Sequence, residues 1–293
     1  MSPKDRLTSG AMMTLLVLGT IWGFNMVTIK ISNQGLAPVT AAALRSGVAS
    51  LFLMAWMIFR RIPLFHRREI VLWGAWAGIL FGLEFLLLYA GLDRTSASRG
   101  IVLLYTCPFF VAVGAHFYLP GDRLTWPKSI GLILAFIGTA SVMGQHALTF
   151  DPDTLYGDLL ALGAGFAWGV TTLVIKKHLA GRVEAISTLH YQLFFSLFIL
   201  VPGSLILEPH PVLDFTVMTA AALFYQSIIV ALFSYLTWFV LIHRFPASRV
   251  ASFAFFGPVM GVLAGGIFLG EPWPPTLLLG LGGIAAGIYL VNR

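Results

Sequence analysis

Long apolar stretches, separated by short polar connections, run along the whole chain. A helix that crosses a membrane needs about 20 mostly apolar residues. Ten stretches meet that requirement, at residues 11–32, 37–59, 70–92, 97–119, 127–146, 156–177, 185–207, 215–241, 247–269 and 273–291. The connections leave no room for a soluble domain, so the pattern predicts an all-α integral membrane protein with ten transmembrane helices.

Residues that favour helix ends flank several of these stretches. Pro38 and Pro127 stand where the first turn of a helix tolerates proline. Ser98 and Ser248 are candidate N-caps, because a serine hydroxyl accepts a hydrogen bond from the free N–H groups of the first turn. The first stretch has no small-residue cleavage site, so it is interpreted as a retained helix rather than a signal peptide.

The composition narrows the class of protein. Of the 293 residues, 58% are hydrophobic and 10% are charged, whereas an ordinary soluble domain has about 25% charged residues. This excludes a soluble enzyme, a disordered chain and a nucleic-acid-binding module. The single cysteine, Cys107, excludes a disulfide framework and a cysteine-rich metal site. We expect neither a metal nor a cofactor, and the sequence contains no P-loop motif for ATP hydrolysis.

The formal net charge of +6 is distributed unevenly over the connections. With a cytoplasmic N-terminus, cytoplasmic segments hold 14 of the 18 Lys and Arg residues and outer segments hold three. Cytoplasmic loops of membrane proteins are enriched in these residues. The distribution therefore predicts that both termini are cytoplasmic, and it makes the basic balance a signal of orientation rather than of a nucleic-acid partner.

Groups of residues recur about 150 positions later in the chain. Trp22-Gly23, followed by Lys30, recurs as Trp168-Gly169, followed by Lys176. Ala97-Ser98-Arg99, followed by Pro108, recurs as Ala247-Ser248-Arg249, followed by Pro258. Residues 1–147 and 148–293 are therefore expected to form two repeats of five helices each. Because five is odd, the second repeat enters the membrane from the opposite side. Two inverted five-helix repeats are typical of secondary transporters.

The repeated residues also carry a family resemblance. Trp22-Gly23 with Lys30, its copy at 168–176, and the stretch Ala247-Ser248-Arg249, Gly257-Pro258 and Leu269-Gly270-Glu271 resemble the EamA-type members of the drug/metabolite transporter superfamily. Within that group the chain is similar to the YddG-type exporters of aromatic amino acids and methyl viologen. The resemblance implies ten helices, a bacterial inner-membrane location and export of small metabolites. The first copy departs from the pattern at Pro120-Gly121-Asp122, where the second reads Gly270-Glu271.

Two charged residues lie inside predicted membrane helices. Arg45 and Glu84 each stand about eight residues from the outer end of their helix, roughly 10–12 Å deep at a rise of 1.5 Å per residue. A charge at the bilayer centre costs about 2.5–3.5 kcal/mol, so such residues are functional hypotheses. We expect the two to form an ion pair. The pair either locks the two helices together or binds substrate, with Arg45 holding a carboxylate and Glu84 an ammonium group or a proton.

Polar and aromatic residues at middle depth are further candidates for a substrate site. Aromatic walls suit flat substrates by stacking and cationic substrates by cation–π attraction. In addition to Arg45 and Glu84, the candidate substrate-binding residues are Asn25, Tyr89, Tyr105, Trp168, His190, Tyr191, Tyr225, Gln226 and Trp238. The alternative for the aromatic residues is ordinary packing, and the alternative for His190 is a packing histidine whose hydrogen bonds are satisfied.

The repeats supply candidate hinges and gates. Pro108 and Pro258 are expected inside helices, where proline kinks the chain, so they are either hinges or static kinks. Arg99 and Arg249 lie in first helical turns, where a cation opposes the helix dipole and requires compensation, for instance from Asp93 near Arg99. The two arginines are either latches at opposite gates or solvated interfacial residues.

Glycines recur four residues apart in several stretches, including Gly283 and Gly287. This spacing lets helices approach closely. With ten helices in the chain, we expect most such contacts to lie within one molecule, so a monomer is predicted, with a dimer as the alternative.

Together these features predict a secondary transporter, not an enzyme, that exports small metabolites by alternating access. Aromatic amino acids and cationic aromatic compounds are the expected substrates, and the lipid bilayer and the substrate are the expected partners. The alternatives are a passive channel, an intramembrane enzyme, and a transporter of other metabolites such as small polar amino acids. Transport is either coupled to a proton carried by Glu84 or is facilitated diffusion.

Overall fold

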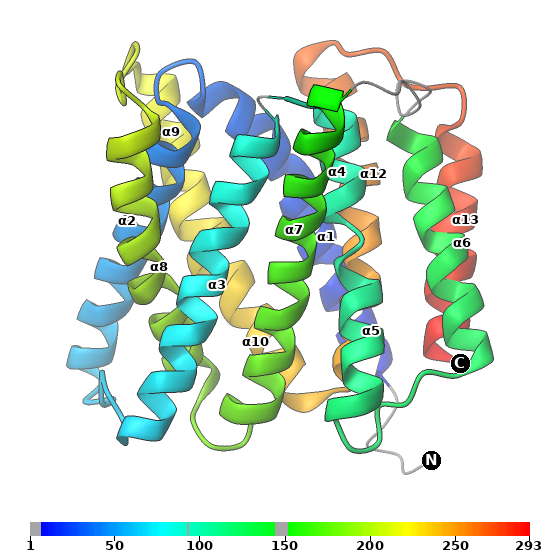
Figure 1. The fold of residues 1–293 in the computed structure, drawn as a ribbon, viewed down its shortest axis with the longest axis horizontal. Coiled ribbons are helices and arrows are strands. Elements are labelled where there is room, and N and C mark those ends of the chain that lie inside the picture. Colours follow the sequence, from blue (N-terminus) through cyan, green and yellow to red (C-terminus); the bar gives the residue numbers. More distant parts are fainter. Residues whose placement is uncertain (1–6, 93, 144–151) are drawn as a thin grey trace. The chain divides into compact units, whose positions relative to one another are not determined.

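The computed structural model describes residues 7–92, 94–143 and 152–293, and every extended regular element within them is a helix. Figure 1 shows these helices coloured along the chain. They form two compact units. The first unit contains Met1–Val27, Leu87–Leu173 and Phe245–Arg293, and the second contains Thr28–Leu86 and Val174–Arg244. Each unit therefore includes segments from both halves of the chain.

Eight segments of the described chain are long and apolar enough to cross a membrane. They are Ser9–Ser32, Pro38–Phe59, Arg68–Leu92, Arg99–Tyr118, Thr154–Leu179, Ala185–Leu207, Val217–Arg244 and Ala247–Leu269. Two further apolar helices, Trp126–Val142 and Leu277–Asn292, are shorter. The predicted all-helical membrane architecture is thus supported, whereas the count of ten crossing helices is not confirmed.

The second unit is built from helices of both halves of the chain. Its elements are α2 (Pro38–Phe59), most of α3 (Arg68–Leu92), η3 (Ile175–Leu179), α8 (Ala185–Leu207), α9 (Val217–Phe224), η4 (Tyr225–Ser234) and α10 (Tyr235–Arg244). Helix α2 packs along α8 and η4. Both η3 and η4 are π-helical, so the stretch predicted at 215–241 is not a uniform α-helix. Such wide turns are rare and frequently occur at functional sites.

The start of α2 is held by an acid from the end of α8. Pro38 occupies its first turn, as predicted. The Glu208 carboxylate accepts hydrogen bonds from the backbone N–H groups of Val39, at 2.6 Å, and Thr40, at 2.8 Å. An anion at this position also interacts favourably with the helix dipole. Glu208 therefore performs the role of an N-cap although it is distant in sequence.

The first unit contains the remaining helices. They are α1 (Ser9–Ser32) as far as Val27, the end of α3, α4 (Ala97–Leu104), α5 (Cys107–Tyr118), α6 (Trp126–Met143), α7 (Pro152–Val174), α11 (Ala247–Ser252), η5 (Phe253–Phe255), α12 (Phe256–Leu269) and α13 (Leu277–Asn292). Helices α6 and α13 run side by side (Figure 1). A Cβ atom on Gly283, one of the glycines spaced four residues apart, would lie 3.3 Å from the Cα atom of Gly138. The glycines thus serve packing within one molecule, as their spacing predicts.

Two predicted helices are broken next to a proline. The stretch at 97–119 divides into α4 and α5, and the stretch at 247–269 divides into α11 and α12 with the 3₁₀ segment η5 between them. Pro108 and Pro258 therefore lie in the first turns of α5 and α12, and the expectation that they stand inside continuous helices is wrong. A proline ring clashes with the carbonyl four residues earlier. Those residues are Leu104, the last of α4, and Ala254, within η5.

The predicted N-caps also differ from the observed ones. Ser96 caps α4, and its Oγ accepts a hydrogen bond from the backbone N–H of Arg99 at 3.3 Å. Ser98 is already the second residue of that helix. Helix α11 begins after Pro246, and Ser248 is its second residue. Each predicted cap is therefore wrong by two residues: the helices begin at Ala97 and Ala247, as the apolar pattern indicates, so the capping position precedes these residues.

Candidate functional site

Two buried residues of opposite charge lie within the second unit. Arg45 on α2 is 2% exposed and Glu84 on α3 is 7% exposed. The predicted direct ion pair between them is absent among the described residues. Instead, the guanidinium carbon of Arg45 lies 4.3 Å from the ring centre of Phe85. A cation at this distance from a ring face gains cation–π attraction, which offers the arginine an alternative to the carboxylate.

Several buried polar atoms of the second unit lack hydrogen-bond partners among the described residues. Arg45 Nε and Nη2 and Glu84 Oε2 are buried without a partner in the described chain. The same is true of both ring nitrogens of His190 and of Gln192 Oε1 on α8. Buried polar groups normally find partners, and charged ones are costly without them. The α2, α3 and α8 part of the second unit therefore offers donors and acceptors that a bound polar molecule could satisfy.

Aromatic rings line the same charges. Phe81 packs edge-on against Phe85, with ring centres 5.0 Å apart, and against Tyr235, with ring centres 5.9 Å apart. Sequence reasoning did not select these three aromatic residues. The signal was present in α3, where Phe81 and Phe85 stand four residues apart and therefore share one helix face beside Glu84.

Other predicted residues of the second unit have structural contacts. The Tyr191 hydroxyl hydrogen-bonds the backbone N–H of His66, at 2.9 Å, and its Nδ1, at 2.8 Å. Gln226, the second residue of η4, donates to the Thr28 carbonyl at 3.1 Å and to the hydroxyl of Ser32 at 2.9 Å. Both side chains therefore join separate segments of the unit and have fewer groups left for a ligand.

His190, Tyr225 and Trp238 complete the predicted set in this unit. His190 is fully buried among aromatic rings, with its ring centre 5.8 Å from that of Phe65 and 5.7 Å from that of Phe194. His190 thus packs among rings, while neither ring nitrogen has a hydrogen-bond partner in the described part of the chain. Tyr225 begins η4, and Trp238 is buried in α10.

The remaining four predicted substrate residues belong to the first unit. Trp168 on α7 packs edge-on against Tyr105, with ring centres 5.7 Å apart, and against Trp22, with ring centres 6.5 Å apart. Asn25 is buried on α1, and Tyr89 lies near the end of α3. Trp22 and Trp168 are the partners of the predicted repeat, so equivalent residues of the two halves pack against each other in this unit.

A polar network at the start of α4 also lies in the first unit. Arg99 forms an ion pair with Asp158 of α7, and its Nε donates to Asp158 Oδ1 at 3.1 Å. The Thr95 hydroxyl donates to the same oxygen at 2.6 Å. Asp93 was the example expected to compensate the charge of Arg99, and it lies outside the described part of the chain. The partner identified here is 59 residues away in sequence.

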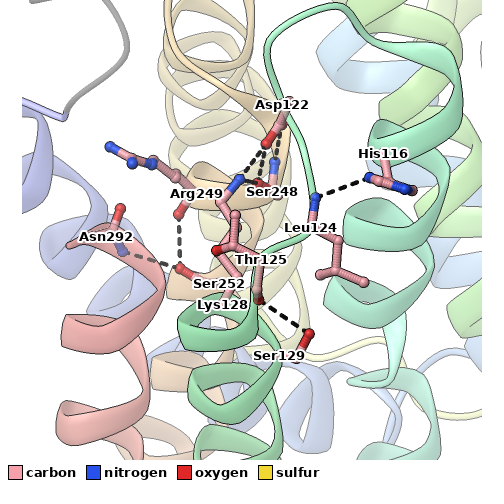
Figure 2. Close-up of polar contacts among 10 residues, drawn as sticks. All are labelled: His116, Asp122, Leu124, Thr125, Lys128, Ser129, Ser248, Arg249, Ser252 and Asn292. Atoms are coloured by element: carbon pink, nitrogen blue, oxygen red, sulfur yellow. Dashed lines mark hydrogen bonds and ion pairs between the residues drawn. The ribbon is translucent and has the colours of Figure 1, made fainter. Parts of the chain in front are cut away.

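A second network lies at the start of α11 (Figure 2). Lys128 Nζ donates to Asp122 Oδ1 at 2.7 Å and to Ser248 Oγ at 3.0 Å. The backbone N–H of Ser248 donates to Asp122 Oδ2 at 2.9 Å, so Asp122 caps α11. Figure 2 shows the guanidinium of Arg249 pointing away from Asp122. Sequence reasoning noted Asp122 only as a departure from the repeat pattern, and it missed Lys128.

The groupings described above consist of hydrogen bonds, ion pairs and ring contacts. Within the described ranges, no three His, Cys, Asp or Glu side chains are grouped so that they could hold a metal ion. The unpartnered charges and aromatic rings of the second unit suit a small organic molecule that is both polar and aromatic.

Comparisons with known proteins assign the family. A model of the EamA-like transporter family matches residues 9–144 and again residues 155–293. An uncharacterized transporter of Bacillus subtilis, YvbV, is 30% identical, with 99% of this chain and 92% of the relative covered. A probable amino-acid metabolite efflux pump of Salmonella typhimurium is 26% identical, with 99% and 95% covered.

Solved structures show the same fold. A crystal structure of a protein that is 18% identical matches 97% of this chain and 98% of its own chain, with a TM-score of 0.82. At this identity the likeness shows the fold alone. The family match spans nearly the whole chain in two copies and agrees with the apolar helices described above. The chain therefore belongs to the EamA-like transporter family and is a multi-pass membrane transporter.

Proposed function

We propose that this transporter exports small amphipathic metabolites across the bacterial inner membrane, with aromatic amino acids as the first candidate substrates and cationic aromatic compounds as the second. One observation carries the proposal: Arg45 and Glu84 are buried in one unit, and Arg45 Nε and Nη2 and Glu84 Oε2 have no hydrogen-bond partner there. An amino acid carries a carboxylate and an ammonium group. It would supply the opposite charge to each residue at once.

The chemistry of such a site follows from the side chains. The Arg45 guanidinium presents donors in a fork that matches a carboxylate, while the Glu84 carboxylate accepts from an ammonium group. Phe81, Phe85 and Tyr235 supply ring faces for an aromatic side chain. A bound substrate would form charge-assisted hydrogen bonds with these side chains. A related protein named as an amino-acid metabolite efflux pump gives the amino-acid class independent support.

We further propose that transport proceeds by alternating access between two inverted repeats of five helices, at residues 1–147 and 148–293, with both termini cytoplasmic. The double family match and the uneven Lys and Arg distribution support this proposal. The helix breaks before Pro108 and Pro258 are candidate hinges. The networks around Arg99 and beside Arg249 are candidate gates on opposite faces, because the repeats are inverted.

Uptake into proteoliposomes tests this function. Purified protein is reconstituted, and the flux of Phe, Trp, Thr and methyl viologen is measured with and without a pH gradient. Saturable flux of an aromatic amino acid is expected in the wild type. Saturable flux of Thr alone would replace the aromatic assignment with a small polar one, and unsaturable flux of all four compounds would favour a passive channel.

Variants separate binding from coupling. E84Q keeps the size of the side chain but removes the charge that would hold the ammonium group, so the apparent KM for Phe is expected to rise at least tenfold. E69Q is the matched control, because Glu69 lies in the first turn of the same helix α3 and is exposed beside Arg182. Unchanged Phe transport in E84Q would refute the assignment. Loss of only the pH-gradient effect would make Glu84 the proton carrier.

A further inference from the structure

A pocket of about 680 Å³ opens within the first unit, where α6 begins and α13 ends. The segment before α11 completes its wall through Pro246. Four basic residues and no acidic residue line the pocket. The basic residues are Arg123, Lys128, Arg249 and Arg293.

The four basic side chains differ in whether they form ion pairs within the protein. Lys128 is neutralised by Asp122, at 2.7 Å. Arg123 and Arg293 are exposed, and neither side chain has an ion-pair partner in the described part of the chain. The pocket therefore keeps at least two positive charges that an anion could pair with. Arginine is well suited to this role, because its planar guanidinium binds phosphate through two donors at once.

Apart from Thr125, the rest of the pocket wall is apolar. It includes Ile130, Leu290 and Val291, and the Trp126 side chain beside them is 82% exposed. Tryptophan is enriched where a membrane protein meets the headgroup region of the bilayer. A free inorganic anion has no apolar part that could pack against this wall. A molecule with a phosphate at one end and hydrocarbon at the other would match both parts of the pocket.

We propose that this pocket binds the headgroup of an anionic phospholipid, with Arg123 and Arg293 on the phosphate and an acyl chain against Ile130 and Leu290. Basic pockets between transmembrane helices are a recognised kind of site for anionic headgroups. The proposed orientation would place this one in the cytoplasmic leaflet. The inference goes beyond the proposed substrate site, which lies in the other unit, and does not depend on which metabolite is exported.

Native mass spectrometry of the purified protein in a neutral detergent tests the proposal. Phosphatidylglycerol and phosphatidylcholine with identical acyl chains are titrated against the wild type and against R123Q/R293Q. Basic residues near a membrane contribute about 1 kcal/mol each. The double variant is therefore expected to bind phosphatidylglycerol roughly 30-fold more weakly, at about 1.4 kcal/mol per tenfold change. Binding of phosphatidylcholine is expected to be weak and unchanged.

Two controls make the result specific. R67Q/R68Q removes the same charge from two exposed arginines of the other unit and should bind phosphatidylglycerol like the wild type. R123K/R293K keeps the charge and should retain most of the preference. Equal wild-type affinity for the two lipids, or unchanged phosphatidylglycerol binding in R123Q/R293Q, would overturn the proposal. Displacement of the lipid by an equal concentration of inorganic phosphate would also overturn it, because the site would then recognise a free anion.

Discussion

The contact between α6 and α13 makes a sharp prediction about Gly287. In the folded protein, a Cβ atom at this position would lie 2.4 Å from the carbonyl oxygen of Gly131, 2.6 Å from the backbone nitrogen of Ala135 and 2.7 Å from its Cβ. Ordinary van der Waals contacts begin near 3.4 Å. Two of the three atoms belong to the backbone of α6, so they cannot be relieved by a change of rotamer. G287A must therefore push the two helices apart.

Gly282 in the same helix supplies the control. A Cβ atom there would meet nothing within 4 Å. Replacing either glycine by alanine gives the same gain in helix propensity, about 1 kcal/mol, so the difference between the two variants isolates the clash. Forcing extra volume into a packed contact costs about 1–3 kcal/mol. We expect G287A to be less stable than G282A by about 3 kcal/mol, the upper end, because the clash is with backbone.

Equilibrium unfolding in mixed micelles measures this difference. Both variants and the wild type are titrated with dodecyl sulfate while the loss of helical circular dichroism is followed. The expected order of the free energy of unfolding is G282A at or above the wild type and G287A below it. Equal stability of G287A and G282A would contradict the close approach of the α6 and α13 backbones.

Three further changes test the polar contacts that hold the units together internally. D122N leaves the buried ammonium of Lys128 without its carboxylate and should lower the free energy of unfolding by about 3–5 kcal/mol in the same assay. The double variant D122N/K128M should lose less stability than D122N alone, and a loss equal to the sum of the two single variants would contradict the pairing. E208A removes the acceptor that caps α2 and should cost about 1–2 kcal/mol, with a smaller loss in E208Q, which keeps one oxygen. Y191F removes the hydroxyl that His66 contacts and should cost about 1 kcal/mol, whereas no loss would show that the contact is not stabilising.

The positions of the helices could be predicted because they depend on a long-range average. A stretch of about 20 apolar residues is recognisable whatever its details, and α2 and α8 begin and end within one residue of the predicted ranges 37–59 and 185–207. Breaks inside helices depend on single residues instead. Pro108 and Pro258 do indicate where their helices break, because a proline ring clashes with the carbonyl four residues earlier. The prediction of a kink placed each break at the proline, whereas the observed break lies before it.

Depth along a helix predicted a neighbourhood but not a contact. Equal depth predicted an ion pair between Arg45 and Glu84, and that pair is absent among the described residues. Depth contains no information about rotation around the helix axis or about competing partners. Here the competing partner is Phe85, one residue after Glu84, whose ring lies under the guanidinium. Sequence reasoning therefore found the charges of the candidate site and missed the aromatic residues that decide how the charges are arranged.

The starts of α4 and α11 show what a local rule can and cannot specify. A cation in the first turn opposes the helix dipole, so an anion was expected near Arg99 and near Arg249. An acid is present at each start: Asp158 pairs with Arg99, and Asp122 accepts the backbone N–H of Ser248. In both cases the acid comes from the other half of the chain, so no search of nearby residues could identify it. The electrostatic requirement is local, whereas the group that satisfies it is chosen by the packing of the two halves. Changing either acid should therefore loosen a contact between the two halves of the chain as well as a helix end.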